Sequence, residues 1–165
     1  MSDKRGTSNE MQVRLRGRKT RYHHGDLKRA LLDAAATLVD IRGREALTLR
    51  EAARRAGVSE AAPYRHFANL DELLGAVALE GYEMLIADLE IAPSARRVRE
   101  AYLAFAGDFP GRYQLMFGPL GDRKAVAQRK EDVAQLAELT VDAGGLAALH
   151  GAASLALAGL GDAAA

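Results

Sequence analysis

The sequence contains no cysteine, so disulfide bonds, thiolate zinc sites and cysteine nucleophiles are all excluded. It also has no run of about 18 apolar residues, the length that a membrane-spanning helix needs. The stretch up to Tyr22 is polar and basic and lacks the apolar core of a signal peptide. These absences predict a cytoplasmic protein with no part in a membrane.

Motifs for enzymatic chemistry are missing as well. His23 and His24 are adjacent, while His66 and His150 lie far apart, so no metal-ligand spacing exists. No serine stands in a Gly-x-Ser-x-Gly setting, and no glycine loop is built to hold phosphates. We expect no metal, no cofactor and no enzymatic activity, which leaves a small helical enzyme as the least favoured of the alternatives.

Charge is distributed unevenly along the 165 residues. Residues 1–67 hold 15 Lys and Arg against 8 Asp and Glu, a balance of +7, whereas residues 68–165 hold 8 against 14, a balance of −6. A basic module joined to an acidic one is typical of a protein whose first half contacts a polyanion. Charge alone does not exclude a chance distribution.

Apolar spacing predicts a first helix from Asp26 to near Gly43. Its inward stripe recurs every three or four residues and consists of Leu27, Leu31, Ala34, Ala35, Leu38 and Ile41. The next helix begins at Thr48, where Thr48 and Glu51 form a capping box, and it ends at Gly57.

A third, short helix is predicted over Glu60–Phe67, capped by Ser59 and limited in length by Pro63. Two short helices joined by a glycine-containing turn are the signature of a helix-turn-helix. Asn69 then caps a long helix, with Glu72 three residues later.

The long helix is expected to close at Pro93. Helical segments follow over residues 98–109, 113–117, 122–142 and 146–160, with breaks at Pro110-Gly111, Gly118-Pro119 and Gly144-Gly145. In the segment over residues 122–142, the inward residues are Val126, Val133, Leu136 and Leu139. No strand pattern is present, so the prediction is an all-α fold: a three-helix N-terminal helix-turn-helix domain followed by a shortened helical bundle.

The run TLREAARRAGVSEAAPYRHF, residues 48–67, strongly resembles the DNA-binding segment of the TetR family. The resemblance covers about residues 27–90, and the ending with tyrosine, histidine and phenylalanine is specific to that family. It implies that the short third helix enters the major groove. Thr48, Tyr64 and His66 are then expected to bind phosphate oxygens, which position a protein on DNA without reading its sequence.

Base reading is expected from residues whose side chains match base edges. These are Arg50, Glu60, Ala61 and Ala62, with Ser59 and Arg65 beside them on the same DNA-binding segment. The polar arm over residues 1–21, predicted to be disordered, adds Arg18, Lys19 and Arg21 as phosphate contacts. A solvated tail is the alternative for the arm.

One residue departs from the family pattern. The family commonly has a lysine two residues before the position of Glu72, where this chain has Leu70. This predicts DNA anchoring weaker by about one phosphate contact, offset by the basic arm.

The second half resembles the TetR C-terminal domains with a Trp-His-Gly signature, through residues 113–118 and Leu149-His150-Gly151. Leucine replaces the tryptophan, and the segment between the two motifs is about one helix shorter than in such domains. The resemblance implies a homodimer through the C-terminal helices that binds a palindromic operator in double-stranded DNA.

Relatives of this kind usually bind a small molecule in the C-terminal half, so the resemblance also implies a small apolar ligand. From the residues themselves, core packing is the favoured interpretation of every candidate pocket residue, and the pocket is implied only by the resemblance. These residues are Tyr82, Leu85, Tyr102, Phe105, Phe109, Tyr113, Met116 and Phe117.

Together these features predict a basic arm over residues 1–21, a DNA-binding domain over 22–69 and a regulatory and dimerisation domain over 70–165. The predicted function is a sequence-specific transcriptional regulator, a repressor that a small molecule releases from DNA. The alternative is a truncated relative that acts as an interaction or ligand-binding module with weak, non-specific DNA binding.

Overall fold

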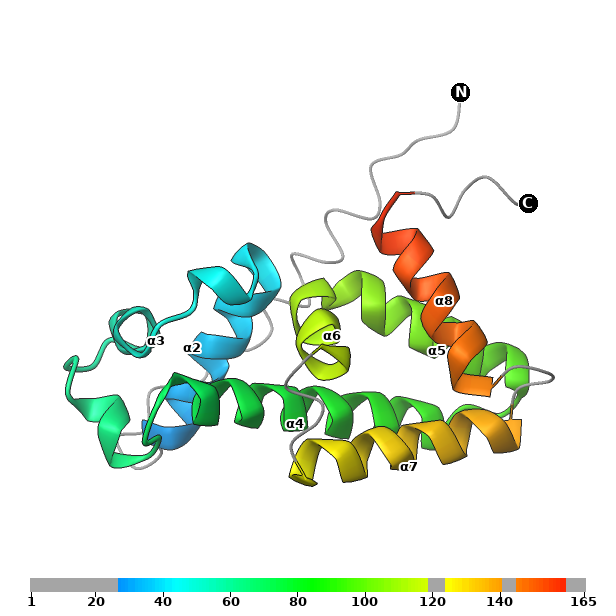
Figure 1. The fold of residues 1–165 in the computed structure, drawn as a ribbon, viewed down its shortest axis with the longest axis horizontal. Coiled ribbons are helices and arrows are strands. Elements are labelled where there is room, and N and C mark those ends of the chain that lie inside the picture. Colours follow the sequence, from blue (N-terminus) through cyan, green and yellow to red (C-terminus); the bar gives the residue numbers. More distant parts are fainter. Residues whose placement is uncertain (1–26, 119–123, 141–144, 160–165) are drawn as a thin grey trace.

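The computed structural model describes residues 27–118, 124–140 and 145–159. Over these residues the chain consists of helices and turns with no strand (Figure 1), so the predicted all-α fold is confirmed. The long helix α4 (Leu70–Glu90) joins an N-terminal group of short helices to a C-terminal group. None of the helices in the described ranges is long and apolar enough to cross a membrane.

The first two helices begin and end close to where the sequence predicts. Helix α2 spans Leu27–Arg42 and helix α3 spans Leu49–Ala56. The Thr48 hydroxyl oxygen accepts a hydrogen bond from the backbone amide three residues later at 3.0 Å, which satisfies one free donor of the first turn. Gly57 ends α3 with a φ of 71°, a conformation that glycine adopts without steric cost.

Half of the predicted capping box is wrong. The Glu51 carboxylate does not return to the backbone amide of Thr48 but forms ion pairs with Arg54 and Arg42. A charged partner makes a stronger hydrogen bond than a neutral amide, and Arg54 lies one turn further along the same helix. The 3₁₀ turn η1 (Arg44–Ala46) brings the end of α2 to the start of α3.

The third helical segment is shorter than predicted. Where the sequence predicts a helix over Glu60–Phe67, the structure has one 3₁₀ turn, η2 (Ala62–Arg65). Pro63 has no amide hydrogen to extend a helix, and its carbonyl accepts the amides three and four residues later, both at 2.9 Å. The first amide of η2 bonds the backbone carbonyl of Ser59 at 2.9 Å, and no side chain caps the turn.

Helix α4 begins at its predicted cap. The Asn69 side chain accepts a hydrogen bond from the Glu72 amide at 2.9 Å, and the Glu72 carboxylate accepts one from the Ala68 amide at 2.6 Å. The helix ends at Glu90, just before Pro93. The predicted start and end of the long helix are therefore confirmed.

Four helices complete the fold. They are α5 (Ala95–Asp108), α6 (Pro110–Phe117), α7 (Lys124–Thr140) and α8 (Gly145–Leu157). The predicted break at Pro110-Gly111 is in fact the start of α6, because a proline in the first position of a helix needs no amide donor.

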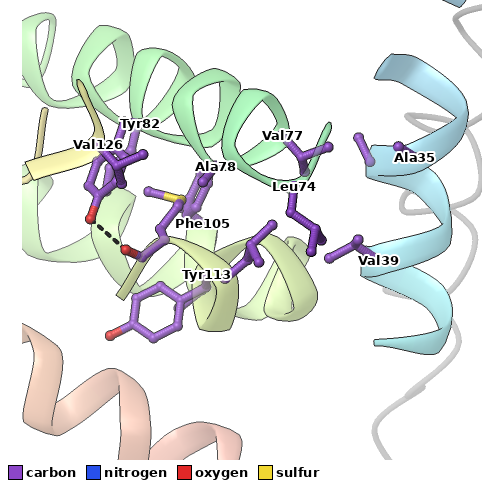
Figure 2. Close-up of a cluster of buried hydrophobic side chains, with 14 of the residues drawn as sticks. Ala35, Val39, Leu74, Val77, Ala78, Tyr82, Phe105, Tyr113 and Val126 are labelled. Atoms are coloured by element: carbon purple, nitrogen blue, oxygen red, sulfur yellow. Dashed lines mark hydrogen bonds between the residues drawn. The ribbon is translucent and has the colours of Figure 1, made fainter. Parts of the chain in front are cut away.

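One hydrophobic core extends through the molecule. Figure 2 shows Ala35 and Val39 of α2 facing Leu74 and Val77 of α4, with Tyr113 of α6 further along the same cluster. The cluster continues into α7 and α8 without a gap. The helices before and after α4 therefore share one core with it.

The inward face of α2 differs from the prediction at its end. Ile41 was expected to face the core but is 64% exposed, whereas Val39 is fully buried. The approach of α6 to the end of α2 selects the Val39 side of the helix. In α7, Val126 and Val133 are buried as predicted, and the Leu139 side chain lies outside the described residues.

A close contact joins α6 to α2. A Cβ atom on Gly111 would lie 2.0 Å from the carbonyl oxygen of Val39, so only glycine fits there. The neighbouring Arg112 guanidinium pairs with the Asp40 carboxylate at 2.7 Å, and both side chains are 12% exposed. The Arg112 amide donates a second bond to Asp40 at 3.1 Å. From this contact, α6 runs on to Phe117 in the C-terminal half of the chain.

Candidate functional site

A helix-turn-helix unit fixes the position of η2. The turn after α3 is closed by the Gly57 amide, which bonds the Arg54 carbonyl at 3.2 Å, and by the Val58 amide, which bonds the Ala53 carbonyl at 3.0 Å. On the far side of η2, Phe67 is 2% exposed and packs into the core. Anchoring at both ends presents the middle of η2 to solvent.

The outward face of η2 and the start of α3 carry hydrogen-bond donors. Tyr64 is 63% exposed, and Thr48 and His66 are also exposed. Because the Thr48 oxygen accepts a backbone amide, its O–H group remains able to donate outward. Hydroxyl and imidazole donors on one rigid face suit phosphate oxygens. The other predicted DNA contacts that are exposed are Arg50, Ser59, Glu60, Ala61 and Arg65.

Two residues predicted to read bases pair with each other in the structure. The Arg50 guanidinium lies 3.0 Å from the Glu60 carboxylate, with 76% and 64% of their side chains exposed. A pair this exposed contributes about 0–1 kcal/mol, so it opens at little cost. Arg50 and Glu60 therefore lie side by side on the surface. Each side chain can release the other and form hydrogen bonds to a base edge instead.

Ala62 does not have the exposure predicted for a base-reading residue. Its side chain is only 8% exposed, so its methyl group packs inward and is not available to a thymine methyl. The 3₁₀ turn has its first two residues, Ala62 and Pro63, buried, while Tyr64 and Arg65 point outward. The Ala62 methyl group therefore cannot reach a base, whereas the neighbouring Ala61 is exposed.

The other predicted contacts near this face have different positions. Leu70, which replaces the lysine of the family, is the first residue of α4 and packs half-buried against the core. Arg18, Lys19 and Arg21, with the rest of the predicted arm, lie outside the described residues.

Most residues predicted to line a ligand cavity belong to the core. Tyr82, Leu85, Tyr102, Phe105, Tyr113 and Met116 are buried, and Phe109 and Phe117 are half-buried. The hydroxyl of Tyr82 is satisfied within the core, where it donates to the carbonyl of Met116 at 2.8 Å (Figure 2). Their burial fits the core-packing interpretation for most of these residues, while Tyr113 and Phe117 also border a hollow.

The hollow lies at the margin of this cluster, between α6 and α8. This groove has a volume of about 370 Å³ and is open to solvent on one side. It is lined by Tyr113, Gln114, Phe117, Gly118, His150, Ser154, Leu157 and Ala158. Of these, Tyr113 and Phe117 were predicted as pocket residues. The two segments that carry the C-terminal resemblance, residues 113–118 and the Leu149-His150-Gly151 motif, meet at this groove.

The groove wall contains a chain of hydrogen-bonded rings. The Tyr113 hydroxyl lies 2.5 Å from His150 Nδ1 and 3.5 Å from the Tyr102 hydroxyl. Burial raises the pKa of Tyr113 and lowers the pKa of His150, which the charge of Lys130 lowers further. At neutral pH both groups are therefore uncharged.

Elsewhere in the described part of the chain, no cluster of three or more His, Asp or Glu side chains could hold a metal ion.

The fold is all-helical, and a glycine turn joins two short helical segments, α3 and η2, which carry an exposed face of hydrogen-bond donors. These features define a helix-turn-helix DNA-binding protein. Residues 31–77 match the family model described as "Bacterial regulatory proteins, tetR family". This match covers the N-terminal part of the chain, including α3 and η2, and relates that part to this family.

Solved structures extend the likeness over most of the chain. A protein with unknown function from Rhodococcus sp. RHA1 is 30% identical, with a TM-score of 0.69 over 89% of this chain and 91% of that one. The multidrug binding protein EbrR, solved in complex with imidazole, is 24% identical, with a TM-score of 0.60 over 80% of this chain and 85% of that one. No curated protein sequence matches the chain.

Proposed function

We propose that this DNA-binding regulator is a cytoplasmic repressor that binds a palindromic operator as a homodimer and leaves it when a small molecule binds the C-terminal half. The observation that carries the proposal is the solvent-exposed donor face of η2, held by the buried Phe67 on one side and the Gly57 turn on the other. The charge balance of +7 in residues 1–67 supports contact between this half and a polyanion.

The residues of the DNA-binding face have two proposed roles, which follow from the chemistry of their side chains. Thr48, Tyr64 and His66 bind phosphates and fix the register, while Arg50, Glu60 and Ala61 face the bases. Ser59 and Arg65 flank them, and the basic arm with Arg18, Lys19 and Arg21 adds attraction to the backbone. The domains are divided as residues 22–69 for DNA and 70–165 for regulation and dimerisation.

Ligand control has support in a relative and in the packing. EbrR is named a multidrug binding protein and was solved with imidazole. In the present chain, α6 lines the groove with its last residues and contacts α2 through Gly111 and Arg112 at its start. A ligand that shifts α6 would therefore press on the helix that supports the DNA-binding unit.

Dimerisation is proposed through the outer face of α8. Ala147, Ala148 and Gly151 are exposed there, and Leu155 is 52% exposed. Added atoms at Gly151 would meet nothing within 4 Å in one protomer, which leaves room for the close approach of a second helix. Two copies related by a two-fold axis would place two η2 faces on the two halves of a palindrome.

Selection of binding sites from random duplex DNA tests this function. We expect a palindromic sequence bound with a steep salt dependence, and a dimer in sedimentation. Tyr64→Phe and His66→Ala should weaken binding to every duplex alike, because they remove phosphate donors. Arg50→Ala should relax preference at one base position, by about 1–3 kcal/mol.

The alternative outcome is a monomer with weak binding that is indifferent to sequence, as a truncated relative would show. If all three variants weakened binding in the same manner, the division between phosphate and base contacts would be wrong.

A further inference from the structure

The groove between α6 and α8 is built around the Tyr113 hydroxyl. A tyrosine hydroxyl has one proton to donate and two lone pairs with which to accept. The Tyr113 and Tyr102 hydroxyl oxygens lie 3.5 Å apart, and either can donate to the other. The closer partner is His150 Nδ1, 2.5 Å away. Because a phenol is a stronger acid than a neutral imidazole N–H and the imidazole nitrogen is the stronger base, Tyr113 donates its proton to Nδ1.

The direction of this hydrogen bond determines the tautomer of His150. If Nδ1 accepts the tyrosine proton, the neutral ring carries its hydrogen on Nε2. The ring is held by Tyr113, with which it stacks at 5.5 Å between centroids and 25° between planes. His150 is half-exposed and lines the groove, and within the described residues its only hydrogen-bond partner is Tyr113. The Nε2–H group is thus an oriented donor available to a ligand.

The remaining walls of the groove are aromatic or uncharged. The rings of Phe117 and Tyr113 lie 5.0 Å apart at 48°, and the ring of Phe117 lies 4.9 Å from that of His150. Gln114 and Ser154 add neutral polar groups, and no side chain lining the groove is ionised at neutral pH. Lys130 acts on His150 electrostatically but does not line the groove, so a permanently charged ligand would lose hydration there without a charged group in the walls to pair with.

The volume restricts the size of the occupant. About 370 Å³ is at the small end of the range of ligand pockets, roughly 300–1,000 Å³. One aromatic ring with a short substituent suits this space and the three surrounding rings.

We propose that the groove binds an uncharged aromatic molecule whose carbonyl oxygen accepts a hydrogen bond from His150 Nε2–H. This inference rests on the proposed ligand control of the regulator and names the chemical class of its ligand. The ring of the ligand packs against Phe117, and its carbonyl faces α8.

The test uses acetophenone as the probe, with toluene, benzoate and benzylamine as comparisons, in titrations of the full chain followed by ¹H–¹⁵N NMR without DNA. Acetophenone should shift the amides of α6 and α8 around the groove in a saturable way. Toluene lacks the acceptor and should bind about fivefold more weakly, the effect of one hydrogen bond. Benzoate and benzylamine should bind more weakly still.

Two variants assign the site. His150→Phe retains a ring and removes the donor, so the preference for acetophenone over toluene should disappear. Ala158→Trp fills the groove from an exposed position and should abolish binding of both. Ala156→Trp, also exposed on α8 but outside the groove lining, is the matched control and should bind acetophenone as the wild type does. Because position 158 is exposed, this pair remains informative even if His150→Phe fails to fold.

The inference is overturned if acetophenone does not bind, if benzylamine binds as tightly, if acetophenone keeps its advantage over toluene in folded His150→Phe, or if Ala158→Trp binds like Ala156→Trp. Operator binding is measured separately on the same proteins. If the chain binds its operator but not acetophenone, only the inference about the ligand is wrong. If it binds acetophenone through His150 but binds no operator, the proposed regulatory function is wrong.

Discussion

Gly111 shows how one missing side chain determines the arrangement of two helices. The backbone of α6 approaches that of α2 so closely that a Cβ on Gly111 would overlap the carbonyl of Val39. This approach brings the Arg112 guanidinium within 2.7 Å of Asp40, where both groups are largely removed from water. Gly111, with no side chain, and the Arg112–Asp40 ion pair therefore specify the contact between α6 and α2.

Gly111→Ala is expected to destabilise the protein by about 1–3 kcal/mol, because α6 must withdraw from α2 to admit the methyl group. Urea unfolding followed by circular dichroism measures the change. Gly107→Ala is the matched control: that glycine also lies in a helix, and nothing stands within 4 Å of its added Cβ, so stability should stay the same or rise. Equal stability of Gly111→Ala and the wild type would contradict the close contact.

The pKa of His150 predicts a dependence of stability on pH. Burial lowers this pKa, assisted by the charge of Lys130, so the folded protein holds the ring proton less tightly than the unfolded chain does. The stability contribution is complete above the unfolded pKa of about 6.5 and is lost as the pH falls from there through the lower folded pKa. The free energy of unfolding should therefore fall on acidification.

In His150→Phe this part of the fall is removed, so the slope of stability against pH should be smaller between about pH 7 and pH 5. Urea unfolding at several pH values measures both slopes. The comparison does not depend on the absolute stability of the variant, which also loses the bond to Tyr113. Identical slopes would show that the ring is not buried as described.

At the scale of helices, local sequence was sufficient at three of the predicted caps, whereas the side chain of Ser59, also predicted as a cap, caps no helix. Thr48, Gly57 and Asn69 each act within a few residues, and the structure places helix ends beside all three. Residues whose surroundings come from distant segments were less predictable. The inward turn of Ala62 depends on how η2 packs, and Ile41 was misplaced because α6, about 70 residues later, approaches the other side of α2.

The groove shows the same limit. Tyr113 and His150 stand 37 positions apart, and they meet only because α8 packs against α5 and α7 beside the end of α6. Sequence identified both motifs but could not show that the large aromatic residues between the helices fill a core while the hollow lies at its edge.

Thr48 allows the stability of α3 to be separated from DNA binding. Thr48→Ala should cost about 1 kcal/mol in unfolding free energy, because the cap is lost. Thr48→Asp retains a capping oxygen and should restore stability, but its negative charge should repel phosphate and weaken binding to the selected duplex. Fluorescence anisotropy measures the affinity. Ser94→Asp changes the cap of α5, away from this face, and should leave DNA binding unchanged.

If Thr48→Asp bound the duplex as tightly as the wild type, the start of α3 would not face the phosphate backbone. If it were as unstable as Thr48→Ala, the capping role of residue 48 would fail instead. The two measurements thus address different parts of the account.

At the scale of the whole molecule, charge and packing both support a DNA-binding half that is mechanically coupled to the half with the groove. The basic half carries the exposed donors of η2, and the acidic half carries the groove and the outer face of α8. A continuous core through α4 and the contact of α6 with α2 make the two halves one mechanical unit. A change at the groove therefore has a physical route to the DNA-binding face.

The most direct measurement is a ¹H–¹⁵N NMR titration of the full chain with a duplex from the site selection, at low and at high salt. The account predicts that the largest amide shifts fall at Thr48, Arg50 and residues 59–66, and that raising the salt concentration weakens binding steeply. Shifts confined to α7 and α8, or no saturable change at η2, would contradict the claim that this exposed face binds DNA.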